Sequence, residues 1–256
     1  MMHHLVTGPV AAPALVLSNS LGTSTAMWDP QAEALSERFR VVRYDHRGHG
    51  AAPVPRGPYE LADLGRDVVQ LLDRLEIERA SVCGVSLGGM VGVWLGLHAP
   101  ERVDRLVLCC TSAHLPPASA WAERAATVLE AGSTAPIADA VLGRWLTPVG
   151  AASRPELVER LRRMLLATPP EGYAACCGVI ERLDLRDSLP AITAPTLAIA
   201  GAQDPATPPE HLEAIAAAVP DARLQVLDGA AHLANLERPE AVAQLILEHC
   251  GGRAWA

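Results

Sequence analysis

The chain has 256 residues, half of them hydrophobic and a fifth charged, which suits one large globular domain and excludes a disordered chain. Its formal net charge of −8 argues against nucleic acid or an anionic membrane as a general partner. All 21 basic residues are arginine, so mechanisms that require a lysine, namely Schiff-base catalysis, a Ser–Lys dyad and a P-loop NTPase, are excluded.

The first half of the chain alternates between strand-like and helix-like patterns. Continuous apolar runs predict buried strands at 14–18, 40–44, 80–84 and 103–110, after a weak alternation at 3–6. Helical spacing of apolar residues predicts helices at 30–37, 61–75 and 87–97. Strands and helices in this order are typical of an α/β fold, with a mostly parallel sheet covered by helices on both faces.

The pattern changes after residue 111. Only helical signals occur up to residue 189, and they predict helices at 118–130, 136–145, 155–166 and 173–183. Strands then return at 196–200 and 223–226, with helices at 209–218 and 237–249. A purely helical insertion between two strands predicts a cap over the carboxyl edge of the sheet. We therefore expect an α/β core at 1–112 and 190–256, and a helical cap at 113–189.

One serine lies in a glycine-rich turn between a predicted strand and a predicted helix. Residues 84–88, GVSLG, match the G-x-S-x-G pattern of a nucleophile elbow in that context. The strained turn leaves no room for side chains beside the serine, which explains the glycines. Ser86 is therefore the predicted nucleophile. The alternative is a packing turn in which Ser86 only caps the helix.

A serine nucleophile requires a base, and the base requires an orienting acid. Asp204 and His232 each follow a predicted strand, in the chain order Ser, Asp, His that is typical of such sheets. The carboxyl ends of parallel strands meet at one edge, so we predict a catalytic triad of Ser86, Asp204 and His232. Taken singly, Asp204 would be a turn residue before proline and His232 a helix cap. His46 and His49 are expected to brace their own loop.

An acyl-transfer site also needs two N–H groups for the developing oxyanion. We predict that one comes from Leu87, at the start of the helix, and the other from Leu21, in the loop after the strand at 14–18. For Leu21, the alternative is an ordinary polar turn.

These residues resemble the α/β-hydrolase family over nearly the whole chain, and within it the 3-oxoadipate enol-lactonases. The segments that carry the resemblance are SNSLGT (18–23), MWDPQ (27–31), YDHRGHG (44–50), GVSLGG (84–89) and AH (231–232). The first of these is the most specific, because most relatives have His-Gly there. The chain departs from the pattern of the family in two respects. Its N-terminus is short, so the first strand of the family is expected to be missing or reduced, and it has no decarboxylase-like C-terminal extension of the kind fused to some relatives.

The resemblance implies an α/β-hydrolase fold and a serine hydrolase without cofactor or metal. It would open the lactone ring of 3-oxoadipate enol-lactone to 3-oxoadipate through an acyl-enzyme, in aromatic degradation by the β-ketoadipate pathway. His232 would activate Ser86, Asp204 would orient the imidazole, and the N–H groups of Leu21 and Leu87 would hold the oxyanion.

A lactone that carries a carboxylate needs a cation nearby in a protein of net charge −8. Arg144, in the predicted cap, is the favoured substrate-binding residue, because an arginine fork gives specificity that an apolar pocket lacks. Its neighbour Trp145 is either a pocket wall or part of the cap core. A solvated arginine is the alternative for Arg144. The less favoured candidates in the cap are Arg124, Arg160, Arg162, Arg163 and Arg182.

Two other functions fit the same residues. A general carboxylesterase or a metal-free perhydrolase would use the same triad, and a non-catalytic binding protein would keep the fold without turnover.

No disulfide framework, signal peptide, metal-ligand spacing or membrane-spanning run is visible. We therefore expect reduced, mostly buried thiols in a cytoplasmic enzyme that acts on a small-molecule lactone, as a monomer or a small homo-oligomer.

Overall fold

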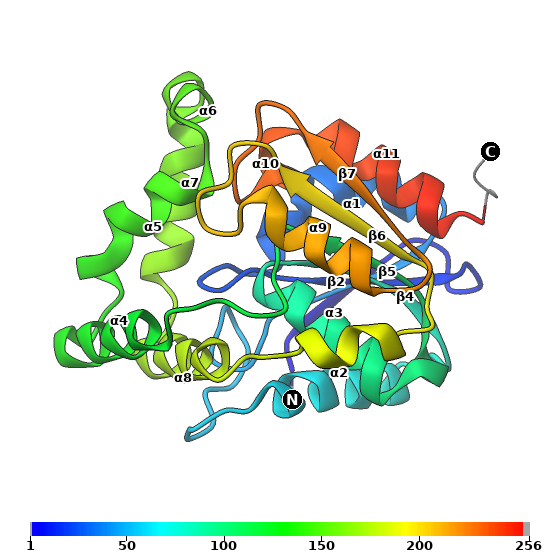
Figure 1. The fold of residues 1–256 in the computed structure, drawn as a ribbon, viewed down its shortest axis with the longest axis horizontal. Coiled ribbons are helices and arrows are strands. Elements are labelled where there is room, and N and C mark those ends of the chain that lie inside the picture. Colours follow the sequence, from blue (N-terminus) through cyan, green and yellow to red (C-terminus); the bar gives the residue numbers. More distant parts are fainter. Residues whose placement is uncertain (1, 253–256) are drawn as a thin grey trace.

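A seven-stranded sheet forms the centre of the protein in the computed structural model, which describes residues 2–252 (Figure 1). Its strands are β1 (His4–Thr7), β2 (Ala14–Ser18), β3 (Arg40–Tyr44), β4 (Ala80–Val85), β5 (Val103–Cys109), β6 (Thr196–Gly201) and β7 (Ala222–Leu227). Their order across the sheet is β1-β3-β2-β4-β5-β6-β7. The edge strand β1 pairs antiparallel with β3, and the other pairs are parallel. All residues of the central strand β4 are buried, as expected for a strand covered on both faces.

Helices cover both faces of this sheet (Figure 1). On one face α1 (Asp29–Ser36) packs against α11 (Pro239–Cys250). On the other lie α2 (Leu61–Arg74), α3 (Leu87–His98) and α9 (Pro209–Ala218). The apolar helix α3 is buried over most of its surface, and its glycines let it approach the sheet closely. A Cβ at Gly88, for example, would run into the carbonyl group of Ser18.

Five helices are inserted between β5 and β6 and stand together on one side of the sheet, at the left in Figure 1. These inserted helices are α4 (Ala118–Ala131), α5 (Ala138–Trp145), α6 (Pro148–Ser153), α7 (Pro155–Leu166) and α8 (Pro170–Glu181). Helix α4 packs against α8, and α5 packs against α7. The division into a core at 1–112 and 190–256 and a cap at 113–189 remains our proposal for how the chain is organised.

The predicted strands from residue 14 onwards agree with the structure to within one residue at each end, and the α/β class with its mostly parallel sheet is confirmed. Two differences concern helices. The short helix α6 was not predicted, because its six residues carry no apolar periodicity. The helix predicted at 237–249 corresponds to α11 and is preceded by a separate short helix that was not predicted, α10 (Ala234–Glu237); the two are separate because Arg238 lies outside the helical region, with φ −127° and ψ 56°, and Pro239 starts a new helix. All six cysteines are buried and unpaired, as expected.

Candidate active site

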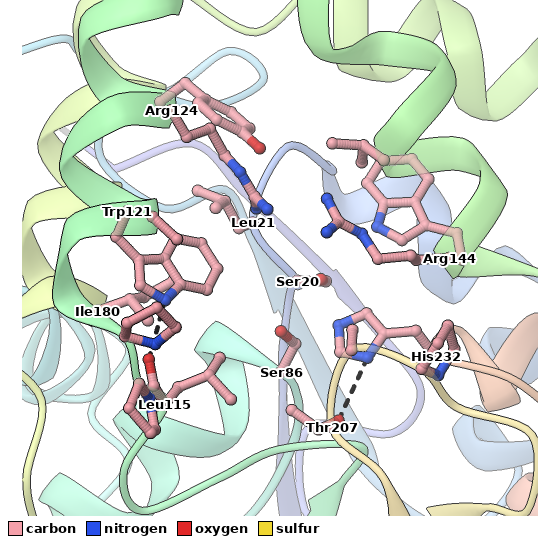
Figure 2. Close-up of a pocket in the computed structure, with 18 residues that line it drawn as sticks. Ser20, Leu21, Ser86, Leu115, Trp121, Arg124, Arg144, Ile180, Thr207 and His232 are labelled. Atoms are coloured by element: carbon pink, nitrogen blue, oxygen red, sulfur yellow. Dashed lines mark hydrogen bonds between the residues drawn. The ribbon is translucent and has the colours of Figure 1, made fainter.

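Ser86 occupies the turn between β4 and α3 in a strained backbone conformation. Its φ of 56° and ψ of −116° are rare for a residue with a side chain. The turn closes only because its neighbours are glycines: a Cβ at Gly84 would run into the carbonyl group of Gly88. The side chain of Ser86 projects into a pocket at the carboxyl edge of the sheet (Figure 2).

The neighbouring strand β5 and the residues just after it fix this turn from the side. The N–H of Ser86 donates to the carbonyl of Cys109 at 3.0 Å. The hydroxyl of Thr111 donates to the carbonyl of Ser86 at 2.6 Å. With both main-chain polar groups of Ser86 engaged, the strained conformation is held by β5 and the segment that follows it.

His232 follows β7, and its Nδ1 lies 2.9 Å from Oδ2 of the buried carboxylate of Asp204, which follows β6. Burial alone would raise the pKa of Asp204, but His232 and hydrogen bonds from Thr207 more than offset it and hold the pKa below its usual value. The ionised carboxylate accepts from Nδ1–H, which leaves Nε2 as the acceptor. Figure 2 shows the imidazole of His232 facing Ser86 across the pocket floor.

Thr207 completes the surroundings of this pair and was not predicted from the sequence. Its Oγ1 donates to Asp204 Oδ2 at 2.7 Å and lies 3.3 Å from Nδ1 of His232 (Figure 2). Asp204 Oδ1 accepts from the N–H groups of Ala206 and Thr207 at 2.8 and 3.1 Å. The Asp-x-x-Thr spacing of such a turn was the available signal.

Leu21 lies in the loop after β2 and lines the pocket, whereas the side chain of Leu87 is buried in the core at the start of α3. Within residues 2–252, the main-chain N–H groups of Leu21 and Leu87 donate to no protein acceptor. The N–H of Leu87 belongs to the first turn of α3, where the helix dipole favours an anion. Both predicted donors are therefore available to a ligand oxygen.

Two buried histidines support the loop that carries Leu21. The N–H of the next residue, Gly22, donates to Nε2 of His49 at 3.0 Å, and Nε2 of His46 lies 3.0 Å from the carbonyl of Asn19. Burial is the main cause that lowers the pKa of His46 to about 3 and that of His49 to about 4. His49 is thus a neutral acceptor near pH 7. The two histidines brace the loop after β2, whereas the sequence predicted only that they brace the loop in which they lie.

The pocket above Ser86 has a volume of about 240 Å³. Its floor comes from the sheet edge, with Ser20, Leu21, Ser86, Thr207 and His232. Its roof comes from the inserted helices and the segment before them, with Leu115, Trp121, Arg124, Val141, Arg144, Trp145, Tyr173 and Ile180. The walls are mostly apolar, and the guanidinium groups of Arg124 and Arg144 point into the space between them (Figure 2).

The structure thus separates the predicted substrate-binding arginines into two groups. Arg144 lines the pocket and so does Arg124, which was a less favoured candidate. The remaining candidates pair with carboxylates away from it: Arg160 with Asp29, Arg162 with Asp139, Arg163 with Glu159 and Arg182 with Glu60. Trp145 is both a pocket wall and a buried residue of the inserted helices.

The loop of His232 is tied directly to the segment that follows Arg144. The N–H of Leu233 donates to the carbonyl of Trp145 at 2.9 Å. The buried carboxylate of Glu237 accepts from the N–H and hydroxyl of Thr147 at 2.9 and 2.7 Å, and from the N–H of Ala231 at 2.6 Å. No pattern in the sequence pointed to Glu237, because its partner Thr147 is 90 residues away.

Chemically, the arrangement combines a strained serine, an imidazole oriented by an ionised carboxylate, and two free N–H donors. These are the groups that acyl transfer requires. Within residues 2–252, no group of three or more His, Cys, Asp or Glu side chains gathers as metal ligands would. Among the helices described in the same range, none is long and apolar enough to cross a membrane.

Known proteins resemble the chain over almost its full length. A family model for the alpha/beta hydrolase fold matches residues 13–239. The 3-oxoadipate enol-lactonase 2 of Acinetobacter baylyi is 42% identical over 240 residues, which cover 94% of this chain and 89% of that protein. A hydrolase from Pseudomonas aeruginosa is 49% identical with a TM-score of 0.94, covering 98% of this chain and 94% of its own. The enol-lactonase from Burkholderia xenovorans is 40% identical with a TM-score of 0.94, covering 97% and 95%.

Proposed function

The chain belongs to the α/β-hydrolase fold family, and from this premise we propose that it is a serine hydrolase that opens the lactone ring of 3-oxoadipate enol-lactone to 3-oxoadipate. One observation carries the proposal: a single pocket of about 240 Å³ holds Ser86 and His232 at its floor and guanidinium groups at its roof. A neutral ester needs only Ser86 and His232, whereas a lactone with a free carboxylate also uses the guanidinium groups.

The proposed reaction begins with attack of the Ser86 hydroxyl on the lactone carbonyl. Nε2 of His232 takes the proton, and Asp204 stabilises the imidazolium. The N–H groups of Leu21 and Leu87 donate to the negatively charged oxygen that was the carbonyl oxygen. Together they stabilise the transition state by a few kcal/mol, on the order of the loss measured when one such donor is removed from other hydrolases. The ring C–O bond then breaks, and the enol oxygen receives the proton from His232.

The leaving enol stays tethered to the acyl-enzyme through the rest of the ring. Its conversion to the ketone removes the nucleophile that would close the ring again. His232 then takes a proton from water, and the resulting hydroxide attacks the acyl carbonyl. Collapse of this second tetrahedral intermediate breaks the bond to Ser86, which recovers its proton from His232, and the keto-diacid is released.

The guanidinium of Arg144 is proposed to bind the carboxylate of the lactone, with Trp145 as a wall beside it. The pocket offers no other kind of cation, since the protein has no lysine. An arginine–carboxylate fork fixes both the distance and the orientation of the ring relative to Ser86. The β-ketoadipate pathway and a cytoplasmic location accompany this activity as parts of the same proposal.

The test compares spectrophotometric loss of the enol-lactone with hydrolysis of a neutral p-nitrophenyl ester by the unmodified enzyme and by Arg144→Met. We expect KM for the lactone to rise by about 10- to 100-fold and KM for the ester to stay within about twofold. Equal effects on both substrates would favour a general carboxylesterase instead.

A second measurement addresses catalysis itself. A fluorophosphonate should label Ser86 covalently, and the label should be lost in both Ser86→Ala and His232→Ala. Absence of labelling together with absence of turnover would point to a non-catalytic binding protein of the same fold.

A further inference from the structure

Two arginines in the roof of the pocket lack the partners that the other arginines around them have. Arg124 on α4 and Arg144 on α5 both direct their guanidinium groups into the cavity (Figure 2). Within residues 2–252 neither forms an ion pair with a carboxylate of the protein. The other six arginines of the inserted segment each have an acceptor: Arg154 donates to the carbonyl of Leu236, and the rest pair with carboxylates, namely Arg160, Arg162, Arg163, Arg182 and Arg186.

The two guanidinium groups are also close enough to repel each other. Burial is the main cause that lowers the pKa of Arg144, and the positive charge of Arg124 lowers it further. Two like charges that share a half-buried pocket cost free energy unless an anion lies between them. An arrangement of this kind is typical of a binding site rather than of a structural ion pair.

The position of Arg124 is fixed before any ligand arrives. Its guanidinium carbon lies 4.4 Å from the centre of the Trp121 ring, in a cation–π contact. Trp121 is itself held by a hydrogen bond from Nε1 to the carbonyl of Leu115 at 3.0 Å. Arg124 also lies near Tyr173: burial raises the pKa of the Tyr173 hydroxyl, and the positive charge of Arg124 offsets part of this rise. Such preorganisation reduces the entropy lost on binding.

The floor of the same pocket offers a second place for an anion. The free N–H groups of Leu21 and Leu87 lie beside Ser86, with His232 opposite. In the proposed reaction, hydrolysis of the ester produces a new carboxylate at this position. The acid product therefore carries one negative charge more than the lactone, with one carboxylate at each end of the pocket.

We propose that the pocket binds linear dicarboxylates at both ends at once, with one carboxylate shared by Arg124 and Arg144 and the other held by the N–H groups of Leu21 and Leu87. The inference rests on the proposed function for the chemistry at Ser86, and it adds a second arginine and a form of regulation. The dicarboxylic product, and unreactive dicarboxylates of similar length, act as competitive inhibitors of the enzyme.

Isothermal titration calorimetry of the unmodified enzyme with adipate, 6-hydroxyhexanoate and hexanoate, none of which has an ester bond to hydrolyse, tests this proposal. These three molecules have similar chains but two, one and one negative charges. We expect adipate to bind at least about tenfold more tightly than either monoanion. Arg124→Met and Arg144→Met should each weaken adipate binding by about tenfold or more. Arg124→Lys should recover part of the loss, because it restores the charge without the planar fork.

Arg163→Met is the matched control, because it removes the same charge from an exposed arginine on α7 that pairs with Glu159. Adipate binding should be unchanged in this variant. Equal affinity for adipate and hexanoate would overturn the proposal, as would full affinity in folded Arg124→Met or an equal loss in Arg163→Met. Thermal melting of each variant identifies any that fail to fold, and the comparison among the three ligands needs no variant.

The outcomes also separate this inference from the proposed function. Selective adipate binding by an enzyme that does not open the enol-lactone would refute the proposed activity and leave the two-ended site intact. Rapid lactone opening without selectivity for adipate would refute the two-ended site alone.

Discussion

His232 Nδ1 lies 2.9 Å from Oδ2 of Asp204, a buried carboxylate that is 28 residues earlier in the chain. The contact exists because β6 and β7 are adjacent and parallel, so the loops that follow them leave the sheet at the same edge. The ionised Asp204 fixes which imidazole nitrogen carries the proton, and thereby directs the unprotonated nitrogen toward the pocket.

Replacing Asp204 with Asn should lower kcat on a p-nitrophenyl ester by roughly 10⁴-fold, because the amide no longer favours the required tautomer. The Thr207 hydrogen bond can be kept by the amide oxygen, so the fold should persist. Steady-state kinetics with a thermal melt of the same sample checks both statements. A variant that melts normally and keeps more than a tenth of the activity would contradict the role given to Asp204.

Glu237→Gln tests the link between the His232 loop and the inserted helices. The carboxylate accepts from three donors, on Thr147 and Ala231. In Glu237→Gln an NH₂ group replaces one carboxylate oxygen, and it would face a donor from which it cannot accept. We expect a loss of about 1–3 kcal/mol in the free energy of unfolding. Because the loop that carries His232 would lose this support, the imidazole should move from its position, and we expect kcat to fall by about 10- to 100-fold.

The exposed Glu240 on α11 provides the control, and Glu240→Gln should change neither quantity. If Glu237→Gln lowers only the stability and leaves kcat unchanged, Glu237 has a structural role alone.

Gly88→Ala should destabilise the protein by about 2–4 kcal/mol, because the added Cβ meets the rigid carbonyl group of Ser18. Gly143→Ala is the matched control in helix α5, where a Cβ would have no neighbour within 4 Å. It should raise stability by roughly 0.5–1 kcal/mol through helix propensity. Urea unfolding of both variants measures the difference. Equal effects would show that α3 does not depend on the close approach to β2.

His49 should make the protein less stable in mild acid. Its pKa is lowered by burial from the ordinary value of 6.5 to about 4. Between these pH values the unfolded chain binds a proton that the folded protein does not, so stability falls as the pH drops from 6.5 toward 4. For His49 alone the loss is on the order of 3 kcal/mol.

The measurement is the slope of unfolding free energy against pH. His49→Gln should reduce the slope in this range, whatever its effect on stability at pH 7. His98→Gln, at an exposed residue near the end of α3, should leave the slope unchanged. An unaltered slope in His49→Gln would show that this histidine is not the group that titrates.

The sequence by itself determined the features that depend on neighbouring residues. The turn at Ser86 needs glycine on both sides, so the motif and the strain appear together in the sequence. The buried strands are continuous apolar runs, because a parallel sheet covered on both faces leaves no polar side. The positions of Asp204 and His232 followed from the strand ends, since parallel strands bring their carboxyl ends to one edge.

Only the tertiary structure decided which side chains of the inserted helices face the pocket. Arg124 and Arg163 both lie on amphipathic helices, and nothing local distinguishes the one that points inward from the one that pairs with Glu159. Likewise, the contact of Glu237 with Thr147 joins residues 90 positions apart. Periodicity tells which residues share a face of a helix, but the element that covers this face is set by packing between distant segments.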